Sequence, residues 1–487
     1  MPMSPNPEIR EATPIQFDSR QYQEHILKRI QENQDHNILV ELDCGLGKRV
    51  LTYKLVAETF PNTRFVITVN SSSSLQETAQ YLEKEYGGVK GLGVLSPHVR
   101  GPRRLQMLKE SRVILCTARV LANILRKGVV VPETFEGLMI NEVDTILRRV
   151  GHNQVLIQPW SFLLDFFKNH WIIGLSGTLR DDHVVFDNAQ IHLREELQTL
   201  AGFLKNVELI TMDELKGTDL KDYIKPTVLD VVPVQDPVIR ATAMVLDDLI
   251  QSTREEIYQV LQDEGQEPGS AIPQTTRLLH LMLHELPIPE DLAVRYSGLL
   301  MIRKYLYGMS ASSFRRYLYH PILTPKIDTQ RILQDWPKIT PKVQEVVNLT
   351  KKANKTVILS SYLHVVSEIN ELLTQQGVQT FKLTGRVKDK QSVLVEFKHA
   401  KAPAAIILSP VGERDLDLPS ADLLIICDTI NTTKTIYQKM KRSRGGRVVF
   451  LFYANTSEVG KLRRLIDNIM KRYPWSTQLR NVSDLHA

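Results

Sequence analysis

Two glycines and a lysine near the N-terminus have the spacing of a phosphate-binding turn. Gly45, Gly47 and Lys48 follow an apolar run at residues 37–42 and precede an amphipathic stretch that extends to Phe60. Glycines between a strand and a helix let backbone N–H groups close around a phosphate, and the helix N-terminus favours the anion. Lys48 would reach the β- and γ-phosphates of a nucleotide. A Gly-Lys pair also occurs in plain tight turns, so the prediction depends on this strand–loop–helix context.

A second polar group ends the apolar run at residues 137–140. Asn141, Glu142 and Asp144 follow that run directly. At the carboxyl end of a parallel strand beside a phosphate loop, carboxylates usually serve a metal ion or a water molecule. An ordinary polar strand end gives the same pattern. A third run, residues 171–175, ends in Ser-Gly-Thr, which could couple two sites or simply form a turn.

These residues require elements that alternate between strand and helix. The first half has apolar runs at residues 37–42, 64–69, 112–116, 137–140 and 171–175, and the second half at residues 356–360, 380–383, 405–408, 423–427 and 448–452. Continuous apolar strands between helices are typical of a parallel sheet covered on both faces. Residues 240–319 have helical spacing only. The sequence therefore predicts an α/β fold in four parts: a polar leader at 1–16, an α/β domain at 17–232, an all-helical insert at 233–340 and a second α/β domain at 341–487.

Length and composition agree with an ordinary globular protein. The 487 residues correspond to roughly three domains at about 150 residues each. Sixty-one basic and 55 acidic residues give a net charge of +6, which tolerates a polyanionic partner without demanding one. No stretch approaches the ~20 apolar residues of a membrane helix. Cys44, Cys116 and Cys427 are too few and too far apart for a disulfide framework or a zinc knuckle. We therefore expect an intracellular protein of the cytoplasm, nucleoid or nucleus, without a membrane partner.

Taken in chain order, the polar motifs resemble those of superfamily 2 helicases. The matching segments are residues 20–23 (Arg-Gln-Tyr-Gln), 45–48, 141–144 and 176–178 in the first half, and residues 357–362, 383–397, 412–419 and 438–447 in the second. The helical insert is similar to one branch of this superfamily, which contains archaeal Hef, Fanconi anaemia M and the retinoic-acid-inducible receptors. The resemblance covers residues 17–473. It implies two tandem RecA-like domains with ATP in the cleft between them.

The resemblance also implies roles for individual residues. It implies nucleotide binding by Gln23, Gly45, Gly47, Lys48, Arg49, Asn141, Asp144 and Asp417. Gln23 would bind the adenine and Lys48 the phosphates. It implies catalytic roles for Glu142, which would activate the attacking water, and for Arg442 and Arg444. It implies nucleic-acid contacts by Ser72, Thr117, Arg119, Thr384 and Arg386.

The insert adds a candidate nucleic-acid surface of its own. Arg315 and Arg316 alternate with aromatic residues, which suits contact with nucleic acid. At helical spacing about half of such aromatics are more typical of a protein core, so both interpretations stay open. We expect the insert helices to pack on the second α/β domain.

The sequence departs from the family where magnesium is normally held. The family loop ends in Lys-Thr, whereas Arg49 follows the lysine here, and the family's acidic motif begins with Asp, whereas this one begins with Asn141. In the last motif Lys441 and Arg444 occupy glycine positions, and Gly445 stands in place of an arginine. Magnesium needs oxygen ligands. Losing both usual ligands argues against ordinary magnesium-dependent hydrolysis, but not against binding of ATP or ADP.

The two substitutions suggest an electrostatic replacement for the ion. Arg49 and Asn141 each raise the local formal charge by one relative to the family pattern. A guanidinium binds phosphate oxygens in a bidentate manner at any relevant pH. We expect nucleotide binding without magnesium, no metal ligand from the protein, and slow hydrolysis, because a guanidinium cannot order the attacking water as a metal ion does.

The sequence thus predicts an ATP-dependent, helicase-like translocase or remodeller of DNA, with RNA left open, impaired hydrolysis and a role in DNA repair. The alternative is a pseudohelicase that binds nucleic acid or a partner without turnover. Some relatives in the Hef branch carry a nuclease domain. Because this chain ends at Ala487, we expect any nuclease to come from a separate polypeptide.

Overall fold

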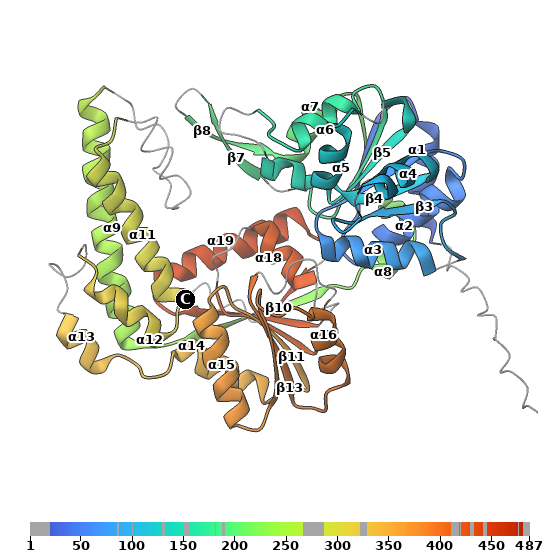
Figure 1. Cartoon of the computed structure of the whole chain (residues 1–487). Helices are drawn as coiled ribbons and strands as arrows, with labels where there is room; N and C mark the ends of the chain where they lie inside the picture. The colour runs from blue at the N-terminus through green and yellow to red at the C-terminus, as the bar shows by residue number, and fades with distance from the viewer. Residues whose placement is uncertain are drawn as a thin grey trace, which may run out of the picture. The chain divides into compact units, whose positions relative to one another are not determined.

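The computed structural model describes residues 20–84, 87–99, 101–128, 132–149, 155–180, 182–187, 190–265, 287–321, 329–410, 418, 420–428, 433–441, 446–475 and 477–480. The predicted leader at 1–16 lies outside these residues. The chain divides into two compact units. The first comprises Met1–Arg180 and Glu195–Tyr223, and the second comprises Asp181–Arg194 and Ile224–Ala487. Each unit contains a seven-stranded sheet of its own (Figure 1).

The first unit is a parallel sheet with helices between its strands. Its strands are β1 (Asn37–Glu41), β2 (Phe65–Val69), β3 (Leu92–Leu95), β4 (Val113–Thr117), β5 (Gly137–Asn141), β6 (Trp171–Ser176) and β9 (Val207–Ile210). They lie in the order β3-β4-β2-β5-β6-β1-β9, and every neighbouring pair is parallel. The carboxyl ends of all these strands therefore meet at one edge of the sheet, where the predicted polar motifs lie.

Helices connect the strands of the first unit. They are α1 (Gln21–Glu32), α2 (Lys48–Lys54), the π-helix η1 (Leu55–Thr59), α3 (Ser72–Lys84), α4 (Pro102–Glu110), α5 (Ala118–Leu125), α6 (Trp160–Phe166), α7 (Glu196–Leu204) and α8 (Leu220–Tyr223). Shorter 3₁₀ turns are η3 (Pro132–Thr134), η4 (Val143–Arg149) and η5 (Glu214–Gly217). A separate two-stranded sheet consists of β7 (Asp182–Asp187) and β8 (Gln190–Glu195). Asp181–Arg194 belong to the second compact unit.

The second unit repeats this plan. Its strands are β10 (Thr227–Val234), β11 (Lys355–Leu359), β12 (Gln379–Leu383), β13 (Ala404–Leu408), β14 (Leu423–Ile426), β15 (Arg447–Tyr453) and β16 (Thr477–Leu479), in the parallel order β12-β13-β11-β14-β15-β10-β16. Helices α14 (Pro341–Thr350), α15 (Leu363–Gln375), α16 (Lys390–His399), α18 (Thr433–Met440) and α19 (Ser457–Arg472) accompany them. The fold is that of two parallel α/β domains, as predicted.

One predicted boundary differs from the structure. The predicted division between residues 232 and 233 lies inside β10, which pairs with β15 and β16 in the second sheet. β10 was missed because Asp230 and Pro233 interrupt its apolar run. Asp230 is buried and accepts a hydrogen bond of 2.9 Å from Nε of Arg447 on β15, so its charge is compensated inside the sheet. The compact units divide between Tyr223 and Ile224.

The insert is helical in its described residues and shares a core with the second sheet. It consists of α9 (Pro237–Asp263), α11 (Glu290–Gly308), α12 (Ala311–Phe314), the 3₁₀ turn η7 (Arg315–Tyr319) and α13 (Thr329–Asp335). Figure 1 shows α9 and α11 side by side, and two ion pairs, Arg303–Asp247 and Arg295–Glu256, join them. Apolar side chains of these helices belong to one cluster with Ile358, Ile407 and other residues of the second sheet. The predicted packing of the insert is confirmed.

A candidate nucleotide-phosphate site

The loop after β1 has a backbone that only glycine adopts without strain. Gly45 and Gly47 have φ angles of +85° and +81°, in the left-handed region that disfavours residues with a Cβ. A Cβ on Gly47 would also lie 2.6 Å from Nε2 of Gln23. The loop begins where the N–H of Leu42 donates to the carbonyl oxygen of Ser176 at 2.9 Å, and α2 starts at Lys48. The sequence therefore folds here into the strand–loop–helix turn that it predicts.

Lys48 lies among carboxylates at the edge of the sheet. Its Nζ is 3.5 Å from Oε1 of Glu142 and donates to the carbonyl oxygen of Leu42 at 3.3 Å. Burial alone would lower the pKa of Lys48, but the negative groups around it, Glu142 foremost, outweigh burial and raise this pKa above its ordinary value. A Cβ on Gly177 would lie 3.0 Å from the same Nζ, so the Ser-Gly-Thr turn makes room for the lysine. Lys48 is thus a fixed cation at the loop.

The polar end of β5 faces the same loop. Oδ1 of Asn141 accepts a hydrogen bond of 3.4 Å from Oγ1 of Thr52 on α2. Glu142 has a φ of +58°, a left-handed conformation that costs roughly 1–2 kcal/mol for a residue with a Cβ. Asp144 is buried and accepts a 2.7 Å hydrogen bond from Oγ of Ser176. The ends of β5 and β6 are therefore linked, as their positions on neighbouring parallel strands predict, and the end of β5 also contacts α2.

Gln23 and its neighbour support the loop from α1. Gln23 is 1% exposed, and its Nε2 donates to the carbonyl oxygen of Leu46 at 3.3 Å. The hydroxyl of Tyr22 donates to the same oxygen at 2.8 Å, and Arg20 donates to that hydroxyl at 3.0 Å. The structure thus places Gln23 beneath the phosphate loop. Its predicted role toward adenine stays a prediction.

Arg49 follows the lysine at the start of α2 and pairs with α3. Its Nη2 lies 2.5 Å from Oε2 of Glu77, and the two side chains are 40% and 22% exposed. Residues around the loop fit phosphate, through the glycine turn and Lys48. In the family pattern that the sequence resembles, the magnesium ligand positions correspond to Arg49 and Asn141, and neither of these side chains is a carboxylate. The carboxylates around Lys48 belong to Asp43, Glu142 and Asp144. Among the described residues, no cluster of three or more His, Cys, Asp or Glu could hold a metal ion.

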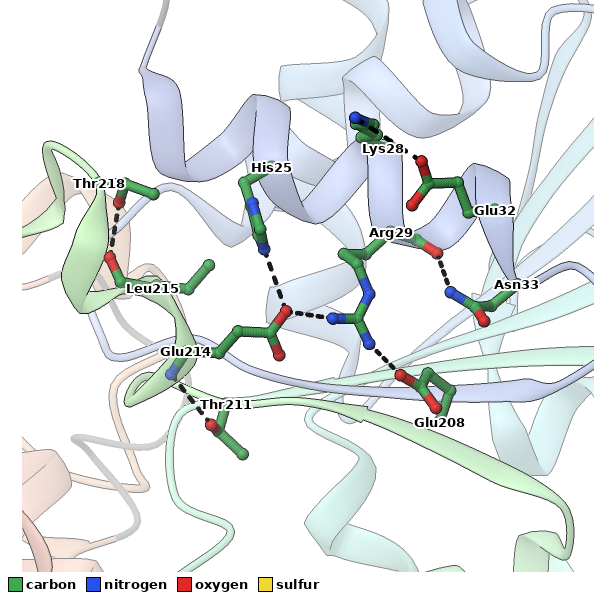
Figure 2. Close-up of polar contacts among 10 residues, drawn as sticks. All are labelled: His25, Lys28, Arg29, Glu32, Asn33, Glu208, Thr211, Glu214, Leu215 and Thr218. Carbon is green, nitrogen blue, oxygen red and sulfur yellow. Dashed lines mark hydrogen bonds and ion pairs between the residues drawn. The ribbon is translucent and has the colours of Figure 1, made fainter.

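The contacts that hold α1 in place are not apparent from the sequence. Figure 2 shows His25 and Arg29 of α1 converging on Glu214, with distances of 3.0 Å from Nε2 and 2.5 Å from Nη1 to Oε1. Arg29 also pairs with Glu208. Asp219 accepts hydrogen bonds from the first N–H groups of the helix. The last segment of the first unit therefore fixes the helix that supports the loop. No signal in the sequence links residues so far apart.

A second missed interaction fixes the strand before the loop. Glu41, the last residue of β1, is buried and binds Arg180 through both carboxylate oxygens, at 2.6 and 2.8 Å. The N–H of Met212 donates to the same carboxylate at 3.0 Å, and Arg180 also donates to Asp213 at 2.6 Å. Burial alone would lower the pKa of Arg180, but both carboxylates raise it. The Ser-Gly-Thr turn is thereby tied to β1.

Three predicted site residues lie outside the described residues. They are Asp417, Arg442 and Arg444. Their implied roles at the nucleotide therefore stay predictions.

The predicted nucleic-acid contacts of the first unit lie at the same edge of its sheet. Ser72 begins α3 after β2 and is exposed. Thr117 ends β4, and its hydroxyl accepts a 3.4 Å hydrogen bond from the N–H of Val120 as the N-cap of α5. Arg119, two residues further along, is exposed. Because β2 and β4 are parallel neighbours, the two turns lie close together.

The equivalent turn of the second unit follows β12. Thr384 is buried, and its hydroxyl accepts a 3.4 Å hydrogen bond from the N–H of Arg386. The side chain of Arg386 is exposed. This turn therefore offers one cation at the carboxyl edge of its own sheet.

In the insert, the structure separates the arginines from most of the aromatic residues. Arg315 and Arg316 are exposed on η7. Phe314 is buried and stacks on Trp336, with ring centroids 5.4 Å apart, whereas Tyr319 is 61% exposed. Phe314 is therefore a core residue and not part of a nucleic-acid surface. The surface that remains for nucleic acid has two cations and one exposed tyrosine.

Two family models match the chain. The model of the type III restriction enzyme res subunit matches residues 16–181, and the model of the helicase conserved C-terminal domain matches residues 340–447. Together they cover the two α/β halves that carry the motifs described above. The chain belongs to the superfamily 2 helicases.

Curated relatives are similar over different parts of the chain. A protein of Methanocaldococcus jannaschii, provisionally named as an ATP-dependent RNA helicase, is 20% identical over 508 residues, which cover 94% of this chain and 61% of the relative. The ATP-dependent DNA helicase MPH1 of Scheffersomyces stipitis is 22% identical over 232 residues, covering 45% of this chain and 21% of the relative. The chain thus spans about three-fifths of the length of the first relative and about one-fifth of the second.

Solved structures show the same fold. The Hef helicase domain of Pyrococcus furiosus has a TM-score of 0.61 at 17% identity, covering 92% of this chain and 98% of that domain. The structure of S. cerevisiae Dbp5 bound to RNA and ADP BeF3 has a TM-score of 0.50 at 11% identity, covering 96% and 91%. The predicted fold class, two tandem RecA-like domains with a helical insert, is confirmed. In the part of the chain that the structure describes, no helix has the length and apolar character needed to span a bilayer.

Proposed function

We propose that the chain is a nucleic-acid-binding, ATP-dependent translocase or remodeller in which the phosphate loop binds ATP or ADP without a magnesium ion held by the protein, and in which hydrolysis is slow. The observation that carries this proposal is a contrast between residues that meet at one edge of the first sheet. Lys48 and Glu142 lie 3.5 Å apart at the position for phosphate and water chemistry, whereas Arg49 and Asn141 replace the oxygen ligands of the family.

In this proposal, the residues at the phosphate loop have separate roles. The glycine turn and Lys48 hold phosphate oxygens. Glu142 accepts a proton from water, and its strained backbone aims its carboxylate toward Lys48. Magnesium would normally screen phosphate charge and order the water in this chemistry. Without protein ligands for the ion, charge screening falls to Lys48 and Arg49, and the ordering of water is lost. Binding is therefore retained while turnover is slow.

The nucleic-acid partner follows from the exposed turns at the sheet edges. Ser72, Thr117 and Arg119 in the first unit, and Arg386 in the second, supply hydroxyls and cations that suit the phosphate backbone. Arg315 and Arg316 add two cations from the insert. We favour DNA because of the resemblance to the Hef branch. A repair role and a separate nuclease partner rest on the same resemblance, and a pull-down that recovers structure-specific nuclease activity tests both.

The alternative is a pseudohelicase scaffold, and one observation favours it. The two substituted residues are already engaged by protein groups, Arg49 by Glu77 and Asn141 by Thr52. Side chains held by protein groups in this way would form a fixed framework that does not hydrolyse nucleotide.

Phosphate release stimulated by nucleic acid separates the two proposals. The wild-type chain is compared with Lys48→Ala and with Lys28→Ala, a matched control on the exposed face of α1. Turnover that only Lys48→Ala abolishes supports the motor. An equal background in all three proteins supports the scaffold.

A further inference from the structure

We propose that Glu77 is a positioning residue that holds Arg49 between the phosphate loop and the Ser71–Ser74 turn, so that nucleotide and nucleic acid oppose each other within the first unit. This inference rests on the proposed function, because it uses the same loop and the same candidate backbone contact.

The geometry connects two elements that would bind different phosphates. Arg49 directly follows Lys48 at the start of α2, and its guanidinium lies 2.5 Å from Glu77 on α3. Ser73 precedes Glu77 by four residues, so the two side chains share one face of α3. Oγ of Ser73 lies 3.3 Å from Oγ of Ser71, which accepts a 3.1 Å hydrogen bond from the N–H of Ser74. Glu77 therefore lies one turn below a cluster of hydroxyls.

The charges of this arrangement predict the sign of the coupling. Arg49 is one cation beside three anionic positions: Glu77, the nucleotide phosphates and a backbone phosphate at the serine turn. A nucleotide that attracts Arg49 draws this cation away from the carboxylate of Glu77, and the carboxylate then repels a backbone phosphate at the serine turn more strongly. In the same way, a backbone phosphate at that turn adds negative charge beside Glu77, so α3 attracts Arg49 more strongly. Each ligand should therefore weaken the other, and by the same factor, because coupling between two binding equilibria is reciprocal.

Partial exposure limits the size of the effect. Ion pairs that are exposed to this degree give couplings of between about twofold and fivefold. We expect saturating oligothymidylate to weaken ADP binding in chelator by this factor, and saturating ADP to weaken oligothymidylate binding equally. In Glu77→Gln the factor should fall to about one, and ADP should bind more tightly because Arg49 loses its competing partner.

The experiment measures both affinities for the full chain, ADP by calorimetry and labelled oligothymidylate by anisotropy. Glu83→Gln is the matched control, since it removes the same charge from an exposed position on α3. The inference is supported if ADP and oligothymidylate no longer weaken each other's binding in Glu77→Gln but still do so in Glu83→Gln. If Glu77 only stabilises α3, Glu77→Gln would change the melting temperature without changing the factor by which each ligand weakens the other. Affinities that are independent of each other, that reinforce each other, or that respond equally in both variants overturn it. A wild-type chain that binds neither ligand overturns the proposed function itself.

Discussion

Two lysine–glutamate pairs in this molecule have opposite characters. At the phosphate loop, Lys48 and Glu142 are 3.5 Å apart, with side chains 17% and 35% exposed. Where the insert meets the second sheet, Nζ of Lys342 lies 2.7 and 2.8 Å from the two carboxylate oxygens of Glu458, with side chains 4% and 1% exposed. The same two residue types thus form a loose pair at one position and a closed pair at the other.

The difference lies in how the hydrogen-bonding capacity is used. Lys342 also donates to the carbonyl oxygen of Tyr307 at 3.0 Å, which accounts for all three of its donors. Glu458 accepts a further 2.8 Å hydrogen bond from the N–H of Tyr453. Lys48, in contrast, has a long contact to Glu142 and one bond to a carbonyl oxygen, so its ammonium can still donate to a ligand. A saturated buried pair indicates structure, and an unsaturated pair beside a glycine turn indicates a binding site.

The largest effect should come from breaking the saturated pair. Glu458→Gln leaves the buried ammonium of Lys342 without its counter-charge, which typically costs about 3–5 kcal/mol. Urea unfolding should show this loss in the transition of the second unit, with the first unit unchanged, since a chain of two units need not unfold in one step. A loss of less than about 1 kcal/mol, the worth of an exposed pair, would show that this pair is not structural.

The unsaturated pair should respond in the reverse way. Lys48→Ala removes a charged donor to phosphate, and such hydrogen bonds contribute about 1.5–3 kcal/mol each. We expect ADP affinity to fall roughly tenfold to a hundredfold, measured by calorimetry. The free energy of unfolding should fall by less than in Glu458→Gln, because Glu142 keeps access to water. A large loss of stability with unchanged ADP affinity would place Lys48 with the structural pair.

The altered ligand positions give a third test of the loop. Arg49→Thr with Asn141→Asp restores the family's oxygen ligands and removes the cation that screens phosphate. ADP affinity in chelator should fall by about tenfold, comparable to the loss of one charged hydrogen bond, and magnesium should restore it. The unmodified chain should bind equally with magnesium and with chelator. Binding of ADP by the unmodified chain only in the presence of magnesium would contradict the replacement of the ion by Arg49.

Much of the loop could be predicted because the constraint on it is local. A glycine turn between an apolar run and a helix fixes the position of Lys48, and parallel strands bring their carboxyl ends to one edge. Asn141, Glu142 and Ser176 therefore had to lie near the lysine. The inner strands were found for a similar reason, since burial on both faces requires an unbroken apolar run.

The remaining features depend on tertiary packing that leaves no periodic signal. The edge strands β3 and β9 are short and partly exposed, so they lack such a run. The partner of Arg49 could not be predicted, because it depends on how α2 and α3 are rotated relative to each other. Lys342 and Glu458 are separated by 116 positions. Neither residue lies in a motif, and only the folded second unit shows that they are paired.

The smallest effect on stability should come from exposed arginines, which are neither in a saturated buried pair like Lys342 nor beside the phosphate loop like Lys48. Arg315 and Arg316 are exposed on η7, so Arg315→Ala with Arg316→Ala should change the free energy of unfolding by less than about 0.5 kcal/mol per site. If both arginines bind phosphates, affinity for a DNA duplex should fall, and the slope of log affinity against log salt should become shallower by about 0.9 for each phosphate that is no longer neutralised. Anisotropy titrations at several salt concentrations measure this slope. Lys28→Ala, on the exposed face of α1 in the other unit, removes a comparable surface charge as a control. An unchanged slope combined with a clear loss of stability would instead show that these arginines support the insert, as the Lys342–Glu458 pair does.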